Sequence, residues 1–172
     1  ASLLNNQMSL ILPHTRGLFV SNVALHGTGA CGCTPVDVTG DRTASITVTS
    51  SITWDSGTNS NLVDGAFGLN STDSVDTPAT FLDGDYIDFQ YSASKLINEV
   101  TWRAGGAFDF GNWQMTLGGQ TSNTFAVAGT NSTVIAITGL TIGGTNARLV
   151  KVGLVVPSNV WLTEIEFQEC TC

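Results

Sequence analysis

The sequence predicts an all-β protein, an antiparallel β-sandwich. Three observations support this fold class. Apolar and polar residues alternate with a period of two over short segments, as in half-buried strands. Turn signals rich in Gly, Asn and Asp separate those segments. No segment keeps a helical period over three turns. Because each such sheet has one apolar face to bury, two sheets packed face to face are expected.

The alternation recurs along most of the chain. The expected strands are 45–54, 86–91, 96–104, 113–117, 133–140, 147–156 and 161–167. Trp113 falls in phase with Met115 and Leu117, and Trp102 falls in phase with Val100. Side chains two residues apart in a strand share a face, so we expect both tryptophans in the core.

Composition restricts the possible partners. The 172 residues carry a net charge of −8, with 42% hydrophobic and 12% charged residues. That balance is not typical of a disordered chain. The basic residues form no stripe, which argues against binding to nucleic acid or to an anionic membrane surface. No apolar run approaches the roughly 20 residues that cross a bilayer.

The first 30 residues differ from the rest. Their apolar runs are irregular and end in the Gly-rich stretch "HGTGACGC", after which alternation begins. We interpret 1–30 as an N-terminal arm for anchoring or assembly and 31–172 as the sandwich. The alternative for the arm is an extra edge strand of the same domain. The segment also lacks the basic start and long apolar run of a secretory signal, so Ala1 follows either a removed initiator Met or a cleaved signal.

Four segments, taken in order, carry a family resemblance. They are "NLVDG" at 61–65, "YIDFQYSASKLINEVTWRAG" at 86–105, "GNWQMTLGGQTSNTF" at 111–125 and "VWLTEIEFQEC" at 160–170. Residues 31–172 thereby resemble the discoidin, or coagulation-factor C-type, domains of the galactose-binding-like superfamily. Where that family customarily has Trp-Ile-Asp-Leu-Gly, this chain has "YIDFQ". The resemblance implies a jelly-roll sandwich whose two chain ends lie side by side.

Two cysteine pairs bracket the expected sandwich. Cys31 and Cys33 begin it, and Cys170 and Cys172 end it. Since such domains often join their ends by a disulfide, the resemblance implies bridges between the two pairs, with the pairing left open. The alternatives are four thiolates on a structural Zn²⁺ and four reduced thiols.

The resemblance also implies a structural Ca²⁺ beside the "-x-D-G" loop. Carried over residue by residue, its ligands are Asp64, Thr72 and Glu164. The stretch "NLVDGAFGLNSTDSVD" is dense in the oxygen ligands that Ca²⁺ prefers. The alternative is an Asx-turn in which the Asp64 side chain accepts hydrogen bonds from backbone amides.

Ligand recognition in the resembled family uses loops at the end of the sandwich opposite the chain ends. The matching loops here are 53–61 and 103–113. A sugar needs an aromatic platform and planar polar groups. The candidate ligand-binding residues are Trp54, Arg103, Phe108, Asp109, Phe110 and Asn112. Phe108 and Phe110 are expected either to be exposed for ligand contact or, equally, to lie under the Gly-rich loop.

Catalytic motifs are sparse. Both histidines, His14 and His26, lie in the arm, and the carboxylate pair Asp83 and Asp85 is a weaker match to a glycosidase dyad than to a solvated turn. We therefore expect no enzyme activity.

The sequence thus predicts a non-catalytic recognition module, most specifically a glycan-binding adhesion component of a virion such as a phage tail or capsid accessory protein. It would work outside the cell, meet a cell-surface glycan or other host receptor, and contact other virion subunits through the arm as a homo-oligomer or part of a larger assembly. The alternative location is secreted or at the cell surface. The first alternative function is that of a structural assembly or capsid-decoration protein. The third choice is a glycan-active enzyme.

Overall fold

The computed structural model describes residues 34–38, 40–67, 74–136, 144–157 and 160–171. Pro35–Cys170 form one compact unit, and the second unit, Ala1–Thr34 with Thr171–Cys172, lies almost wholly outside the described residues. The predicted arm, Thr72 and the side chains of all four cysteines also lie outside them. The arm and the disulfide bridges therefore stay predictions.

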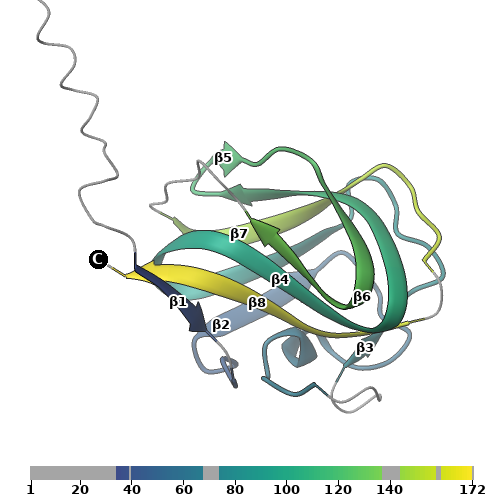
Figure 1. Cartoon of the computed structure of the whole chain (residues 1–172), viewed down its shortest axis with the longest axis horizontal. Helices are drawn as coiled ribbons and strands as arrows, with labels where there is room; N and C mark the ends of the chain where they lie inside the picture. The colour runs from purple at the N-terminus through teal and green to yellow at the C-terminus, as the bar shows by residue number, and fades with distance from the viewer. Residues whose placement is uncertain (1–33, 39, 68–73, 137–143, 158–159, 172) are drawn as a thin grey trace, which may run out of the picture. The chain divides into compact units, whose positions relative to one another are not determined.

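The described residues form antiparallel strands, with one short helical turn. The elements are β1 (Thr34–Val38), β2 (Ile46–Ser50), the 3₁₀ helix η2 (Asn59–Leu62), β3 (Val75–Asp76), β4 (Tyr86–Leu117), β5 (Gln120–Thr121), β6 (Phe125–Ala136), β7 (Gly144–Val152) and β8 (Trp161–Thr171). Figure 1 shows β8 running between β1 and β4, which agrees with the strand order β1-β8-β4-β2. No described helix is long and apolar enough to span a membrane.

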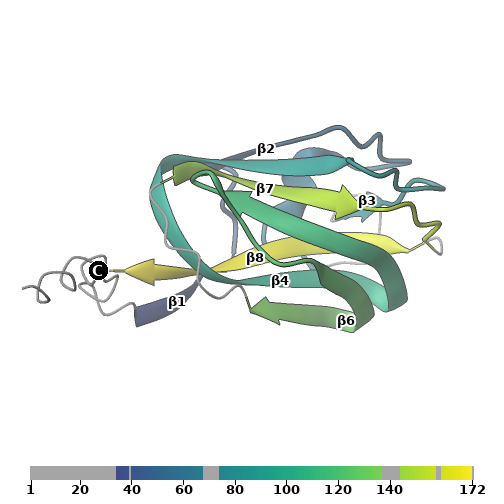
Figure 2. The same cartoon turned by 90° about the horizontal axis from the view of Figure 1, so that it is seen from above.

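Strand β4 builds both layers of the sandwich because it changes layer along its length. Its first part, 86–91, pairs with β2 and β7, and its last part, 112–117, pairs with the other edge of β7. Its middle part, 96–104, lies between β8 and β6. The first layer therefore contains β2, β7 and both ends of β4, and the second contains β8, β6 and the middle of β4. Figure 2 shows these two layers edge-on.

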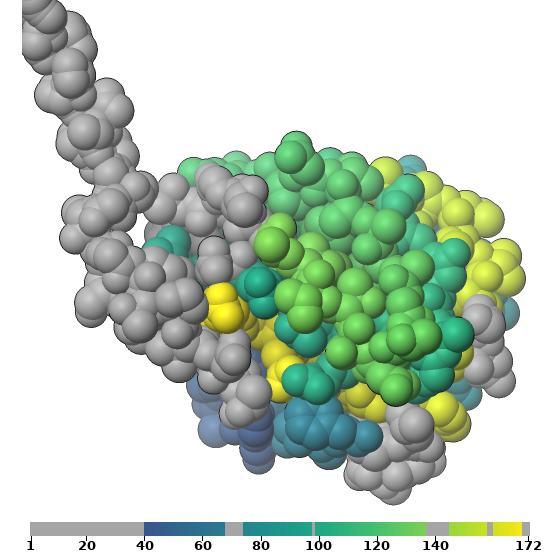
Figure 3. All heavy atoms as spheres, viewed as in Figure 1, coloured from purple at the N-terminus to yellow at the C-terminus, as the bar shows by residue number. Residues whose placement is uncertain are grey.

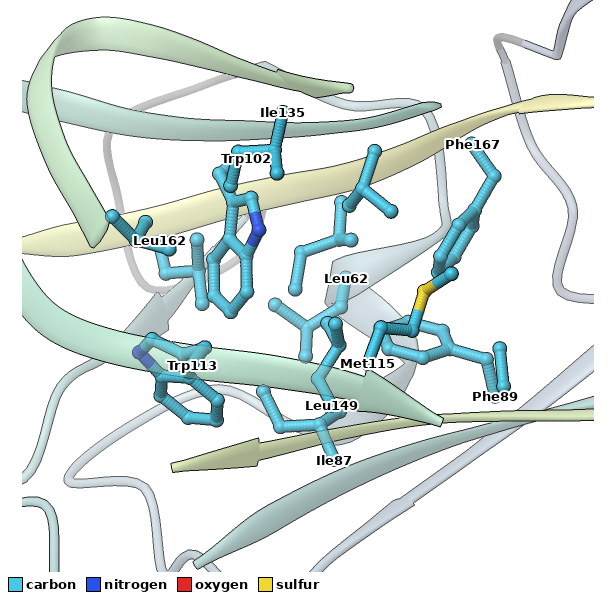
Figure 4. Packing of buried hydrophobic residues seen from close by; sticks show 14 of the residues in the cluster. Leu62, Ile87, Phe89, Trp102, Trp113, Met115, Ile135, Leu149, Leu162 and Phe167 are labelled. Atoms are coloured by element: carbon cyan, nitrogen blue, oxygen red, sulfur yellow. The ribbon is translucent and has the colours of Figure 1, made fainter. Parts of the chain in front are cut away.

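The core lies between these layers and confirms the alternation pattern. Ile87 and Phe89 point inward from the first layer, and Trp102 points inward from the second; all are buried. Trp102 and Trp113, from the middle and last parts of β4, lie with ring centroids 5.2 Å apart. Figure 4 shows these two rings directed toward each other. The all-β antiparallel sandwich and the two core tryptophans are thus confirmed.

Candidate functional site

A surface pocket of about 280 Å³ opens on the outer side of the second layer. Its lining residues are Phe67, Arg103, Ala104, Asn131 and Thr163. They come from the loop after η2, from β4, from β6 and from β8. This side of the molecule faces the viewer in Figure 3, where residues of β6, in green, cover much of it.

Arg103 reaches this outer side because it follows the buried Trp102 in a strand. A register shift follows Arg103 in the pairing with β6 and also in the pairing with β8. The Thr163 hydroxyl donates to the Arg103 carbonyl at 2.9 Å and fixes the distorted backbone. Across the bend, the Gly106 amide donates to the Asn131 side-chain oxygen at 3.2 Å. Asn131 has a φ of 61°, a left-handed conformation that Asn tolerates.

Two contacts hold the Arg103 guanidinium in place. Its Nε donates to Glu166 Oε2 at 2.5 Å, and its Cζ lies 4.8 Å from the centroid of the Phe67 ring. The Arg103 side chain is 38% exposed, whereas that of Glu166 is 7% exposed. Glu166 Oε1 is buried and has no hydrogen-bond partner among the described residues. The pocket therefore holds a cation that a buried carboxylate fixes from beneath.

These groups suit a hydroxyl-rich ligand. The Nη atoms of Arg103 and the amide of Asn131 can donate hydrogen bonds, and the Asn131 side-chain oxygen can accept them. The Phe67 ring, 50% exposed, offers an apolar surface for C–H groups. Because Glu166 neutralises Arg103 locally, the two side chains together contribute little net charge to the pocket. An aromatic ring with a few convergent polar groups is the usual composition of a small-molecule site.

Comparisons with solved structures show that this fold is similar to that of several carbohydrate-binding domains. No family model and no curated protein matches the sequence. Among solved structures, the CBM32 of AlyQ in complex with 4,5-unsaturated mannuronic acid has a TM-score of 0.51 at 19% identity, over 70% of this chain and 92% of that one. The lectin domain of lectinolysin complexed with Lewis B antigen scores 0.53 at 14% identity, over 76% and 97%. A fucolectin from striped bass (Morone saxatilis) serum has a TM-score of 0.57 at 14% identity, over 81% of this chain and 50% of that one.

The chain has the fold of these carbohydrate-binding domains. At such identities the likeness shows the fold alone. Several neighbours are modules of longer chains: this chain spans 27% of the crystallised SpGH29 and 35% of a truncated AlyQ that contains CBM32 and alginate lyase domains.

Phe108 and Phe110 are not part of an exposed loop in this fold. They are 4% and 0% exposed, and their rings stack with centroids 4.9 Å apart. Both lie in β4, where Phe108 pairs with Gly129 of β6. The expectation that these rings are exposed for ligand contact is wrong, because the strand continues through the glycines that predicted a loop.

The other predicted ligand residues lie apart from the Arg103 pocket lining. Trp54 is half-buried against the core, and its Nε1 donates to Asn59 Oδ1 at 2.7 Å. Asp109 is exposed and accepts from the Gly111 amide at 2.8 Å, in the bulge between Asp109 and Asn112. Of the six candidates, the pocket includes Arg103 alone.

Asp109 and Asn112 lie instead near a buried lysine. Lys151 is 1% exposed and its Nζ donates to the carbonyls of Val152 at 2.9 Å, Gly153 at 2.7 Å and Asn112 at 3.3 Å. Burial lowers the pKa of Lys151, and the charge of nearby Asp83 opposes that shift. This lysine ties loop backbones together and has no open face for a ligand.

Asp83 and Asp85 accept hydrogen bonds within the turn, as expected if they belong to a turn and not to a glycosidase dyad. Asp83 Oδ1 accepts from the Gly153 amide at 2.6 Å. Asp85 accepts from the Leu82 amide at 2.8 Å and from the Ser51 hydroxyl at 3.0 Å. Both carboxylates therefore stabilise the local backbone.

The two described members of the predicted calcium site already have hydrogen-bond partners within the protein. Asp64 Oδ1 accepts from the Ala66 amide at 2.9 Å, which is the Asx-turn alternative. Glu164 is fully buried and accepts from Arg42 Nη2 at 2.8 Å and from the Gly65 amide at 3.1 Å. A Ca²⁺ at this carboxylate would meet the positive guanidinium. The described residues contain no group of three or more acidic, His or Cys side chains arranged for a metal.

Sequence reasoning missed Phe67, Asn131, Thr163 and Glu166. Asn131 lies in "GTNS", a stretch that indicates a turn, and Glu166 lies in the closing "EIE" strand. Neither stretch by itself indicates a ligand. The residues at the pocket come from distant parts of the chain, for example Arg103 and its partner Glu166, which are 63 positions apart. Only the folded chain brings them together.

Proposed function

We propose that this chain is a non-catalytic carbohydrate-recognition domain and that the Arg103 pocket binds the glycan. The observation that carries the proposal is the Arg103 guanidinium held between the Phe67 ring and Glu166 at an open surface pocket. Solved neighbours with this fold are named as carbohydrate-binding modules and lectins, which supports the same class of ligand.

The expected binding mode uses both sides of a sugar ring. Hydroxyls accept from Arg103 Nη and Asn131 Nδ2, while the buried Glu166 holds the guanidinium in position. The apolar face of the sugar contacts the exposed part of Phe67. A shallow single site of this kind binds weakly, so useful adhesion requires several copies presented together.

A glycan array tests the proposal. The variant Arg103→Lys keeps a positive charge opposite Glu166 but loses the planar donor set, so we expect binding to fall more than about tenfold, since a charge-assisted hydrogen bond contributes about 1.5–3 kcal/mol. Lys95→Met is the matched control, because Lys95 pairs with Glu169 along the same β4–β8 ladder away from the pocket. Wild-type protein that binds no glycan, or equal binding by both variants, contradicts the proposal.

The wider setting that we propose is adhesion by a virion component, or by a secreted or cell-surface protein. The segment 1–30 and its irregular apolar runs support an anchoring role, and the glycan would be on a host surface. Removing residues 1–30 should leave glycan binding of the isolated sandwich unchanged and abolish assembly with partner subunits.

One observation favours assembly as a second candidate function. Leu82, Leu154 and Val156 are exposed large apolar residues on two segments joined by the Phe81–Val155 bridge. Contiguous exposed apolar side chains mark contact surfaces. If a second copy covers them, light scattering will show a dimer that Leu154→Asp converts to a monomer; a wild-type monomer at high concentration removes this candidate.

A further inference from the structure

A polar row crosses the outer side of the first layer from strand to strand. Thr49 lies opposite Asp88, Asp88 opposite Arg148, Arg148 opposite Thr116, and Thr116 opposite Thr121. We call these five residues the polar row. Directly opposed residues in antiparallel strands place their side chains on the same face. The neighbours Ile87, Phe89, Leu149 and Met115 are buried on the other face, so the polar row points outward.

Arg148, at the centre of the polar row, is rigidly held. Its Nε and Nη2 donate to the two Asp88 oxygens, each at 2.6 Å, and its Cζ lies 4.2 Å from the centroid of the Tyr86 ring. The Asp88 side chain is 11% exposed and that of Arg148 is 43% exposed. A bidentate pair with a ring beneath it leaves the guanidinium little freedom to lose on binding. The remaining Nη1 is a fixed donor at the surface.

A pocket of about 330 Å³ adjoins Arg148. Its lining residues are Thr116, Leu117, Gly118, Gly119, Thr145, Asn146 and Arg148. Gly118 and Gly119 have φ values of 56° and 83°, the conformation of a tight two-residue hairpin turn between β4 and β5. A Cβ at Gly119 would meet no atom within 4 Å. Backbone and small polar groups therefore line the pocket and leave room for a ligand to approach closely.

The charges on this face favour an uncharged ligand. Asp88 neutralises Arg148 within the polar row, and the whole chain carries a net charge of −8. A polyanion would meet a repulsive field without a free cation to offset it. The remaining groups are hydroxyls, amides and backbone, which match sugar hydroxyls.

We infer that the polar row is a second carbohydrate site, which binds an extended neutral polysaccharide chain across the strands and seats one sugar in the pocket beside Arg148. Strands lie about 4.8 Å apart, so five residues on adjacent ladders form a track of roughly 19 Å, long enough for several linked sugars. The inference rests on the proposed function for the class of ligand. The geometry of the site is independent of the Arg103 pocket.

The two sites face opposite directions. The Arg103 pocket lies on the outer side of the second layer and the polar row on the outer side of the first. One ligand molecule cannot occupy both. A domain with both sites therefore links two glycan chains, which changes its role from attachment to cross-linking.

NMR titration of ¹⁵N-labelled protein tests the inference. The probes are tetrasaccharides of β-1,4-linked galactose, glucose and xylose, with a mannuronate tetrasaccharide as the charged comparator. We expect at least one neutral tetrasaccharide to shift the amides of Gly118, Gly119 and Arg148 saturably. The mannuronate probe should shift them several-fold less at equal concentration. Thr116→Val, which removes one hydroxyl of the row at constant shape, should weaken this binding at least threefold, whereas Thr47→Val, on the same face outside the row, should not.

Each result separates this inference from the proposed function. Shifts near Arg103 and Asn131 alone overturn the second site and leave glycan binding intact. Shifts at Gly118 and Gly119 alone support the second site and overturn the Arg103 pocket. Failure of every probe at both places overturns both proposals. Equal shifts from the mannuronate probe, or equal affinities for the two Val variants, overturn the neutral polysaccharide track.

Discussion

Arg42 Nη2 lies 2.8 Å from Glu164 Oε1 and 2.8 Å from the Ile165 carbonyl oxygen, in a contact where the side chains are 5% and 0% exposed. The two residues are 122 positions apart and join the segment before β2 to the closing strand β8. Glu164 also accepts from the Gly65 amide, so one carboxyl group ties three segments together. This is the position where the sequence implied a calcium ligand.

Removing Arg42 should destabilise the sandwich strongly. Above pH 8, where Glu164 is ionised, Arg42→Met leaves the buried carboxylate without its cationic partner, and breaking a buried ion pair on one side costs about 3–5 kcal/mol. Lys95→Met is the control, because Lys95 is 37% exposed and pairs with Glu169 at the surface, where such pairs contribute about 1 kcal/mol or less. Urea unfolding measures both free energies. Equal losses in the free energy of unfolding would show that the buried Arg42 pair stabilises the fold no more than the more exposed Lys95 pair.

The stability of the protein should fall as pH rises through the range in which Glu164 titrates. Burial raises the pKa of Glu164 from 4.5 to about 8, although the hydrogen bond from Arg42 opposes the shift. Between these values the folded state holds a proton that the unfolded state releases, so the contribution of Glu164 is full below pH 4.5 and lost as pH rises through 8.

Glu164→Gln provides the test of that pH dependence, because the amide does not titrate. The variant and the wild type can differ in stability at low pH. Between pH 4.5 and 8, however, the free energy of unfolding of the variant should fall less steeply with pH than that of the wild type, because the contribution of Glu164 is absent. Identical slopes for the wild type and the variant would refute the raised pKa.

Gly65 of the "NLVDG" motif should not tolerate a side chain. Its φ is 77°, and a Cβ there would lie 2.4 Å from the backbone carbon of Gly40. Gly65→Ala therefore combines backbone strain with a clash against main chain and should lower the free energy of unfolding by at least 1–3 kcal/mol. Gly84→Ala, with a φ of 91° but open space around it, reports the strain alone. A Gly65 variant no worse than the Gly84 variant would contradict the clash.

Calcium should leave the melting temperature of chelator-treated protein unchanged. The donors around Glu164 already include the Arg42 guanidinium, which opposes a cation at that carboxylate. A ligand that binds only the folded state raises the melting temperature with concentration. A saturable rise, absent in Asp64→Asn, would instead support the calcium site that the resemblance implied for Asp64 and Thr72.

The sequence predicted the core where alternation is unbroken. Trp102 and Trp113 were assigned correctly because each lies in phase with apolar neighbours in its own strand. Phe108 and Phe110 are also two residues apart and share a buried face, but the flanking glycines indicated a loop. In the folded chain Gly106 and Gly111 have φ values of 65° and 71° and lie at the register shifts that let β4 continue. A glycine at a bulge and a glycine in a loop look alike in sequence.

The candidate site was predictable only in part. Arg103 was identified because it begins the stretch 103–113, which the family resemblance matched to a ligand-binding loop. Phe67 and Glu166 reach it from segments remote in the chain, through contacts that no local pattern encodes. Trp54 was predicted to contact the sugar because an exposed tryptophan ring offers a flat apolar surface. Its ring instead packs on the core cluster, since burial of a large apolar surface outweighs exposure when the adjacent strand allows it.

The aromatic contact of the proposed glycan site is expected at Phe67, and Trp54 supplies the comparison. Phe67 is 50% exposed, lines the pocket and lies under the Arg103 guanidinium, so Phe67→Ala should weaken glycan binding about tenfold while costing little stability. Trp54→Ala should do the reverse, because its ring packs against the core and its Nε1 donates to Asn59. It should lower the free energy of unfolding by about 2–4 kcal/mol and leave the affinity of the remaining folded protein unchanged.

Phe67→Tyr, which keeps the ring, should retain binding. Glycan affinity by surface plasmon resonance and unfolding by urea separate the two residues. If Trp54→Ala loses binding without losing stability, the loop at 53–61 is the recognition surface, as the sequence alone predicted, and the Arg103 pocket is not.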